Sequence, residues 1–118
     1  MQIKKQRMGP LGTNCYLVWD EASHEALLID PAGRPERIAE ILDGFTGTVK
    51  YIVLTHGHAD HVGGLKAAKE YTQAPILIHG ADARMLAEYD DMIARYVGIT
   101  EPPPEPDQLL VGGEQLQI

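Results

Sequence analysis

The alternation of apolar and polar positions predicts a group of short strands at the start of the chain. Residues 2–8 alternate weakly before a glycine and a proline break the pattern, and residues 13–20 alternate more clearly. A turn composition follows around His24, and the apolar residues 25–29 then fit a returning strand. We therefore expect antiparallel strands in this part of the chain.

Helical and strand periodicities alternate after the third strand. We expect a helix from Pro35 to about Leu42, a central strand over 49–54 buried on both faces, a helix over 61–71, a strand over 76–78 and a helix over 81–96. A strand, a helix and a strand in succession predict parallel pairing through a crossover. The proline-rich residues 101–106 are typical of a stiff connector, and 108–111 and 115–118 fit two further strands.

Length and composition are those of one compact α/β domain over residues 1–118, a mixed sheet with flanking helices. The chain has 118 residues, of which 44% are hydrophobic and 23% are charged. This is enough apolar material for a core and gives no sign of disorder.

Charge and cysteine content narrow the class of partner. The net charge of −7 and the scattered basic residues argue against nucleic acid, and no apolar run is long enough to cross a membrane. A single cysteine cannot form an internal disulfide, and no signal peptide precedes the first strand. We expect a cytoplasmic protein with a small-molecule substrate.

The stretch Thr-His-Gly-His-Ala-Asp-His-Val-Gly-Gly at residues 55–64 carries the chemistry. It places three imidazoles and a carboxylate, from His56, His58, Asp60 and His61, directly after an apolar strand. Divalent metals of borderline softness take these donors at roughly 2.0–2.2 Å. Asp60 is also a plausible N-cap for a helix starting near His61, but capping leaves the three clustered histidines unexplained. The stretch therefore predicts a metal site.

Other candidate groups fit structural roles. His24 lies in a predicted hairpin turn, and His79 ends a strand. Cys15 lies within a strand, where a buried thiol acts as a small hydrophobe. Asp30 fits either a plain turn residue or a group that supports the metal centre.

The His-x-His-x-Asp-His run after a strand resembles the signature of the metallo-β-lactamase-fold hydrolases. Residues 11–18, 28–33 and 74–79 are similar to the glyoxalase II branch, the hydroxyacylglutathione hydrolases, although Ala32 stands where these proteins usually have a second glycine. The resemblance implies half of an αββα sandwich of two stacked sheets flanked by helices. The chain would supply the amino-terminal half and stop after Ile118, because no histidine follows His79 and the family's later ligands are missing.

The resemblance also implies a mechanism. His56 and His58 would hold one ion and Asp60 and His61 a second, with zinc expected and iron or manganese possible. A shared metal-bound hydroxide would attack a thioester or ester, while Asp60 acts as the catalytic group that orients it and relays protons. The family also includes enzymes acting on lactones, on phosphodiesters and in sulfur oxidation, and the four ligands do not separate these.

Two hypotheses follow. The first is a glyoxalase II-like metallohydrolase that is inactive as this fragment. The alternative is a non-catalytic, self-associating metal-binding half-domain. In either case the second and third strands would expose an apolar face once the other half is absent, so we expect a homodimer.

Overall fold

The fold is a mixed sheet with helices packed against it. The computed structural model describes residues 1–8, 12–55, 64–87 and 104–117, with only the backbone described for 84–87. Its elements are β1 Gln2–Met8, β2 Thr13–Asp20, β3 Glu25–Ile29, α1 Pro35–Leu42, β4 Thr48–Leu54, α3 Leu65–Thr72, β5 Ile76–His79, α4 Gly80–Ala87 and β6 Gln108–Leu110.

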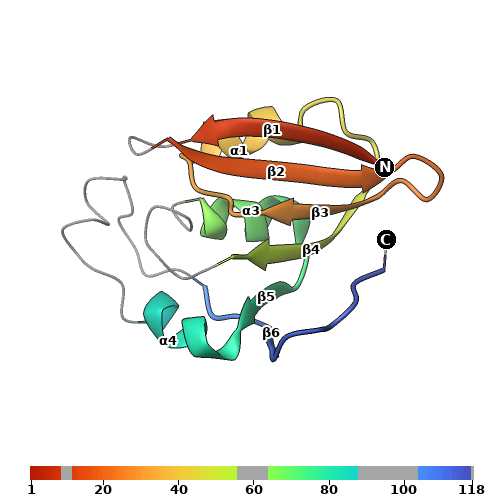
Figure 1. The fold of residues 1–118 in the computed structure, drawn as a ribbon. Coiled ribbons are helices and arrows are strands. Elements are labelled where there is room, and N and C mark those ends of the chain that lie inside the picture. The colour runs from red at the N-terminus through yellow and green to blue at the C-terminus, as the bar shows by residue number, and fades with distance from the viewer. Residues whose placement is uncertain (9–11, 56–63, 88–103, 118) are drawn as a thin grey trace.

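The six strands lie in the sheet in chain order, from β1 at one edge to β6 at the other (Figure 1). β1, β2 and β3 pair antiparallel, whereas β3, β4, β5 and β6 pair parallel. The expected antiparallel start and the parallel crossover through a helix are both confirmed. The carboxyl ends of β3, β4 and β5 consequently meet along one edge of the sheet, which we call the carboxyl edge.

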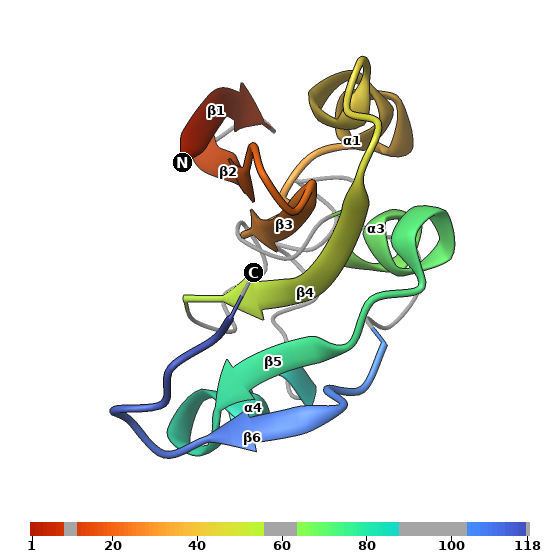
Figure 2. The same ribbon diagram turned by 90° about the vertical axis from the view of Figure 1, so that its right-hand side faces the viewer.

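Helices α1 and α3 lie side by side on one face of the sheet (Figure 2). Their apolar residues recur at helical spacing, so Ile38 and Ile41 of α1 and Leu65 and Ala68 of α3 all point inward and are buried. They cover the alternate strand residues that form the rest of the core. These strand residues are Cys15, Leu17, Ala26, Leu28, Val49, Ile52, Leu54, Ile76 and Ile78.

The helix ends follow from local chemistry. α1 begins with Pro35, whose fixed φ suits a first helical turn, and α3 ends at Gln73, which adopts the left-handed conformation with φ 56°. The backbone N–H of Gln73 donates to the carbonyl of Lys69 and closes the last turn. In the described ranges, no helix is long and apolar enough to span a bilayer.

The opposite face of the sheet carries six large apolar or aromatic side chains that are only partly buried. They alternate with the core residues and are matched across the strands by register, in the rows Val18, Leu27, Tyr51 and Tyr16, Ile29, Val53. We call these six side chains the open face. The expectation that residues 49–54 are buried on both faces is therefore wrong, because α1 and α3 cover only one of them.

Some expected boundaries differ from the structure. The helix expected over 61–71 is described from Leu65 onward, and α4 starts at Gly80 and is described to Ala87, so the remainder of each expected helix lies outside the described residues. The second of the two last strands, expected over 115–118, is not formed at residues 115–117. Gly112 and Gly113 have positive φ, and the carboxylate of Glu114 accepts hydrogen bonds from the N–H groups of Val111 and Gly112. These bonds turn the chain away from the sheet.

Asp107 fastens the start of β6 to the rest of the sheet. Its Oδ2 accepts hydrogen bonds from the N–H of Ile76 at 2.8 Å and from Nζ of Lys69 at 3.0 Å. Lys69 also donates to the carbonyl of Ala74, so one lysine joins α3, the α3–β5 connection and β6. The hydrogen bond from Ile76, followed by that from Lys69, lowers the pKa of the Asp107 carboxyl.

Replacing Asp107 by Asn should destabilise the fold by less than about 1 kcal/mol, because the group is exposed and water screens the pair with Lys69. A carboxyl whose pKa is lower in the folded state stabilises above its unfolded pKa, and this contribution is lost as the pH falls through the folded pKa. The difference between wild type and Asp107→Asn, measured by urea unfolding, should therefore be full at neutral pH and shrink in acid. Glu105→Gln, the same charge change two residues away, is the control. An equal loss in both variants would contradict the role of Asp107.

Candidate metal centre

The turn that follows β3 and the residue that follows β4 lie together at the carboxyl edge. The N–H of Asp30 donates to the carbonyl of Val53 at 3.1 Å, which joins the turn to β4. Because the two strands are parallel neighbours, the first residues beyond them emerge side by side. The segment that carries the expected metal ligands begins at this point.

Asp30 binds Thr55, the last residue before the first histidine, with both carboxylate oxygens. Oδ1 accepts the backbone N–H of Thr55 at 2.8 Å, and Oδ2 accepts its hydroxyl at 2.5 Å. Asp30 itself is buried and has φ 51°, a left-handed conformation that Asp adopts more readily than most residues. This pair of bonds fixes the position and direction of the chain as it leaves β4.

The far end of the same segment is held by the next residue of the turn. The N–H of Gly64 donates to the carbonyl of Pro31 at 2.8 Å. A Cβ at Gly64 would lie 2.6 Å from the carbonyl oxygen of Gly33 and 2.7 Å from Ile38, so only glycine fits this approach. Thr55 and Gly64 are thus anchored to adjacent residues of one turn.

The four expected ligands, His56, His58, Asp60 and His61, lie outside the described residues, and so does the capping alternative for Asp60. Within the described ranges no group of three or more His, Cys, Asp or Glu side chains could hold a metal ion. The donor set fits a divalent metal, since imidazole and carboxylate suit zinc and iron. The structure shows both anchors of the segment at the carboxyl edge, where a loop can collect such donors.

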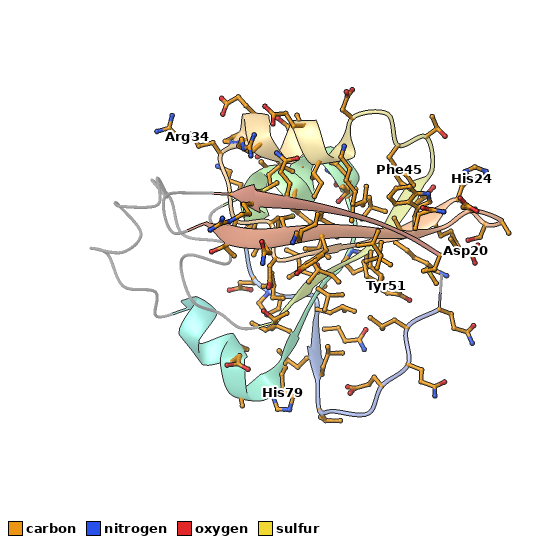
Figure 3. All side chains as sticks on the ribbon, turned by 45° about the horizontal axis from the view of Figure 1, so that its top comes forward. Asp20, His24, Arg34, Phe45, Tyr51 and His79 are labelled. Atoms are coloured by element: carbon orange, nitrogen blue, oxygen red, sulfur yellow. The ribbon has the colours of Figure 1, made fainter. Side chains whose placement is uncertain are left out.

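The remaining candidate groups lie in different places. His24 sits in the turn between β2 and β3, near Phe45 and Asp20 and well away from Arg34, and His79 lies at the end of β5 (Figure 3). His79 Nδ1 accepts the N–H of Ala81 at 3.0 Å, a local bond that fits the structural role expected for it. Burial, together with the negative charge of Asp30, raises the pKa of Cys15 to about 12. This thiol is unsuited to nucleophilic chemistry.

The sequence matches the family model of the metallo-beta-lactamase superfamily over residues 8–117. The chain belongs to the metallo-β-lactamase superfamily. The match covers both the anchored segment and the sheet, so the fold expected from the resemblance is confirmed.

Three members of the superfamily illustrate the relationship. The chain is 38% identical to an uncharacterized protein of Aquifex aeolicus, over 100% of this chain and 55% of that protein. It is 40% identical to the hydroxyacylglutathione hydrolase GloC of Haemophilus influenzae, over 49% of this chain and 27% of that protein. The crystal structure of TTHA1623 in a di-iron-bound form superposes with a TM-score of 0.80 and 32% identity, over 96% of this chain and 56% of that one. The chain thus spans little more than half the length of such superfamily members.

Sequence reasoning gave no role to Thr55, Pro31 or Gly64. Thr55 opens the histidine-rich stretch, and Gly64 closes it, but their partners lie 25 or more residues earlier in the chain. A threonine between an apolar strand and a metal motif of this superfamily, paired with an Asp-Pro turn, is the signal that could have suggested the contact.

Replacing Thr55 by Val removes the hydroxyl bond to Asp30 at nearly constant volume. We expect a loss of about 1–2 kcal/mol in the free energy of unfolding, since the acceptor is charged. Thr55→Ser keeps a hydroxyl and should restore most of this loss. Urea unfolding of the three proteins measures the effect; equal losses in the Val and Ser variants would show that the methyl group, not the hydroxyl, matters.

Proposed function

We propose that this chain is the metal-binding part of a hydrolase that cleaves acyl thioesters in the manner of hydroxyacylglutathione hydrolases. The carrying observation is the double anchoring of the histidine-rich segment at the carboxyl edge of the sheet. A surface stretch of histidines would need no such fixed ends. Two relatives bear the name hydroxyacylglutathione hydrolase, from Haemophilus influenzae and Pelagibacter ubique, at 40% and 35% identity over part of the chain, which favours this chemistry over others of the superfamily.

The residues have distinct tasks in this proposal. His56 and His58 would hold one ion, and Asp60 and His61 a second. Divalent metals supply Lewis acidity and lower the pKa of a coordinated water from 15.7 to about 7. Asp60 would orient the attacking water and take up its proton, while Asp30 and Thr55 hold the segment in place.

The chain by itself offers four donors, whereas two tetrahedral ions need about eight positions. Water or a second chain would have to fill the rest. Because a displacement of about 1 Å can cost roughly a hundredfold in rate, we expect metal uptake but negligible thioester turnover from this chain alone. Zinc is the expected metal, although TTHA1623 carries two iron ions in its crystal structure.

Metal uptake is the first test. Replacing His56 and His58 together by Ala should abolish binding of zinc, iron and manganese, measured by elemental analysis after equilibrium dialysis. The double variant His24→Ala, His79→Ala removes the same number of imidazoles elsewhere and should bind as wild type does. Undiminished uptake by the His56, His58 variant would place the metal at another site.

The same preparations separate the enzyme from its alternative, a metal-binding half-domain without catalysis. Hydrolysis of a simple acyl thioester is measured with and without each metal, in wild type and in Asp60→Asn. A rate that rises with metal and vanishes in Asp60→Asn would show that the chain alone is active, against our expectation. Metal uptake without turnover at any chain concentration is the result we expect.

We further propose that the open face pairs with a second copy of the chain. Its six apolar and aromatic side chains form two matched rows across β2, β3 and β4. Sheets stack face to face at about 10 Å when such rows are apolar. The basic residues Lys4, Lys5 and Arg7 on the edge strand β1 disfavour edge-to-edge pairing, so contact through the face is the more favourable route.

The expected dimer is weak. Three strands about 4.8 Å apart and about five residues long cover roughly 200 Å² in projection. Burying that area on two copies contributes on the order of 10 kcal/mol at about 25 cal/mol per Å². Association costs about 4–15 kcal/mol, so the two terms nearly cancel.

Sedimentation across a dilution series should therefore show a monomer of 13.0 kDa at low concentration and a dimer in the high micromolar range. Leu27→Lys, in the middle of the open face, should abolish the dimer because it would bury a charge there. Val111→Lys, a change at an apolar residue that is 82% exposed in the described structure, is the control. A folded monomer at every concentration would contradict the proposal.

A further inference from the structure

Three of the five arginines in this acidic chain lie where β1 ends and α1 begins. Arg7 is the last but one residue of β1, Arg34 is the N-cap of α1, and Arg37 is in its first turn. Figure 3 shows Arg34 at the opposite end of the molecule from His24 and Phe45. We call the three the arginine patch.

Contacts join the three residues into one patch. Arg37 Nη2 donates to the carbonyl oxygen of Arg7 at 2.9 Å, and its Nη1 forms an ion pair with Glu40 at 2.5 Å. A Cβ at Gly33 would lie 2.9 Å from Cβ of Arg37 and 3.0 Å from Cβ of Met8, so the backbones of β1 and α1 meet here. Arg37 is therefore occupied in joining the two elements.

The other two guanidinium groups are available. Arg7 and Arg34 are exposed, and neither has an ion pair or side-chain hydrogen bond with another described residue. The guanidinium of Arg7 lies over the turn that enters β2, with Nη2 2.8 Å from where a Cβ of Gly12 would be. Two unpaired cations thus remain at one end of the sheet in a chain of net charge −7.

Arg34 does nothing for the helix that it begins. N-cap positions favour Ser, Thr, Asp or Asn, whose side chains accept a hydrogen bond from the first turn, and Arg34 makes no such bond. A positive charge at this end of a helix also opposes the helix dipole. A residue that breaks local rules without a structural gain is one to examine for function.

The patch adjoins the anchored histidine-rich segment directly. Gly33, bonded to Arg34, has the carbonyl oxygen that Gly64 approaches so closely that a Cβ there would be 2.6 Å away. The two guanidinium groups therefore border the expected metal centre. Arginine binds carboxylates through paired N–H donors, and a local cluster of cations attracts anions to an otherwise acidic surface.

We propose that Arg7 and Arg34 bind a carboxylate of the substrate's thiol carrier and so select anionic acyl thioesters over neutral ones. This rests on the proposed function. It assigns to the two arginines a role in specificity, while the metal ligands and Asp60 perform the chemistry. Repulsion by the net negative surface makes such a local cationic contact necessary for an anionic substrate.

Binding of a substrate-like probe tests this without turnover. The probe is S-methylglutathione, a thioether with two carboxylates, titrated into metal-free chain and followed by the arginine Nε–Hε signals in NMR. We expect millimolar binding that shifts two arginine signals and weakens as salt is raised. The double variant Arg7→Gln, Arg34→Gln should raise the Kd at least tenfold, and the diethyl ester of the probe should bind wild type equally poorly.

Lys50→Gln is the charge-matched control, since Lys50 lies on β4 and pairs with Glu25 at the other end of the strand. It should change the Kd less than twofold. Absence of binding by wild type, equal binding of the diethyl ester, or an unchanged Kd in the double arginine variant would each overturn the proposal. Metal uptake by the same wild-type preparation is measured separately, so a failure of the proposed metal site is distinguished from a failure of carboxylate recognition.

Discussion

The structure depends on the turn from Asp30 to Gly33, which binds both ends of one segment. Asp30 fixes Thr55 through two hydrogen bonds, and Pro31 fixes Gly64 through one. The cost of holding Asp30 in a left-handed conformation, of the order of 1 kcal/mol, is offset by these bonds and by the bond from its N–H to Val53. A loop tethered at adjacent residues keeps its ends together whatever happens between them.

The mixed sheet places this turn where it is needed. The parallel pairing of β3 and β4 brings the carboxyl ends of two strands to one edge, and the antiparallel strands β1 and β2 extend the sheet beside them. Helices cover one face, which leaves the open face for another surface and the carboxyl edge for chemistry. The arginine patch lies where β1 and α1 meet, beside the turn.

Periodicity in the sequence predicted most of this framework. Alternation at residues 13–20 located β2 because every second side chain there packs under a helix. Sequence could not show that residues 49–54 are covered on one face only, since a continuous apolar run is the same whether a sheet is covered once or twice. It also suggested a last strand that Glu114 prevents by binding the backbone of the preceding turn.

The candidate site divides in the same way. The ligand types were evident from four residues within a short stretch, whereas the anchors join residues 25 or more positions apart and can be seen only in the fold. Likewise, Arg7 and Arg34 are remote in sequence, and only the contact between β1 and α1 brings them to one place.

Cys15 lies at the centre of β2 with no exposed surface, beneath the helices and close enough to Asp30 to feel its charge. With a pKa of about 12, on the order of one thiol in 10⁵ is ionised at neutral pH, so alkylating reagents reach a reactive thiolate only after the strand has separated from the core. The rate at which such a reagent consumes this single thiol therefore reports how often the sheet opens. The chain carries its own clock for the loss of the scaffold that holds the metal-binding segment.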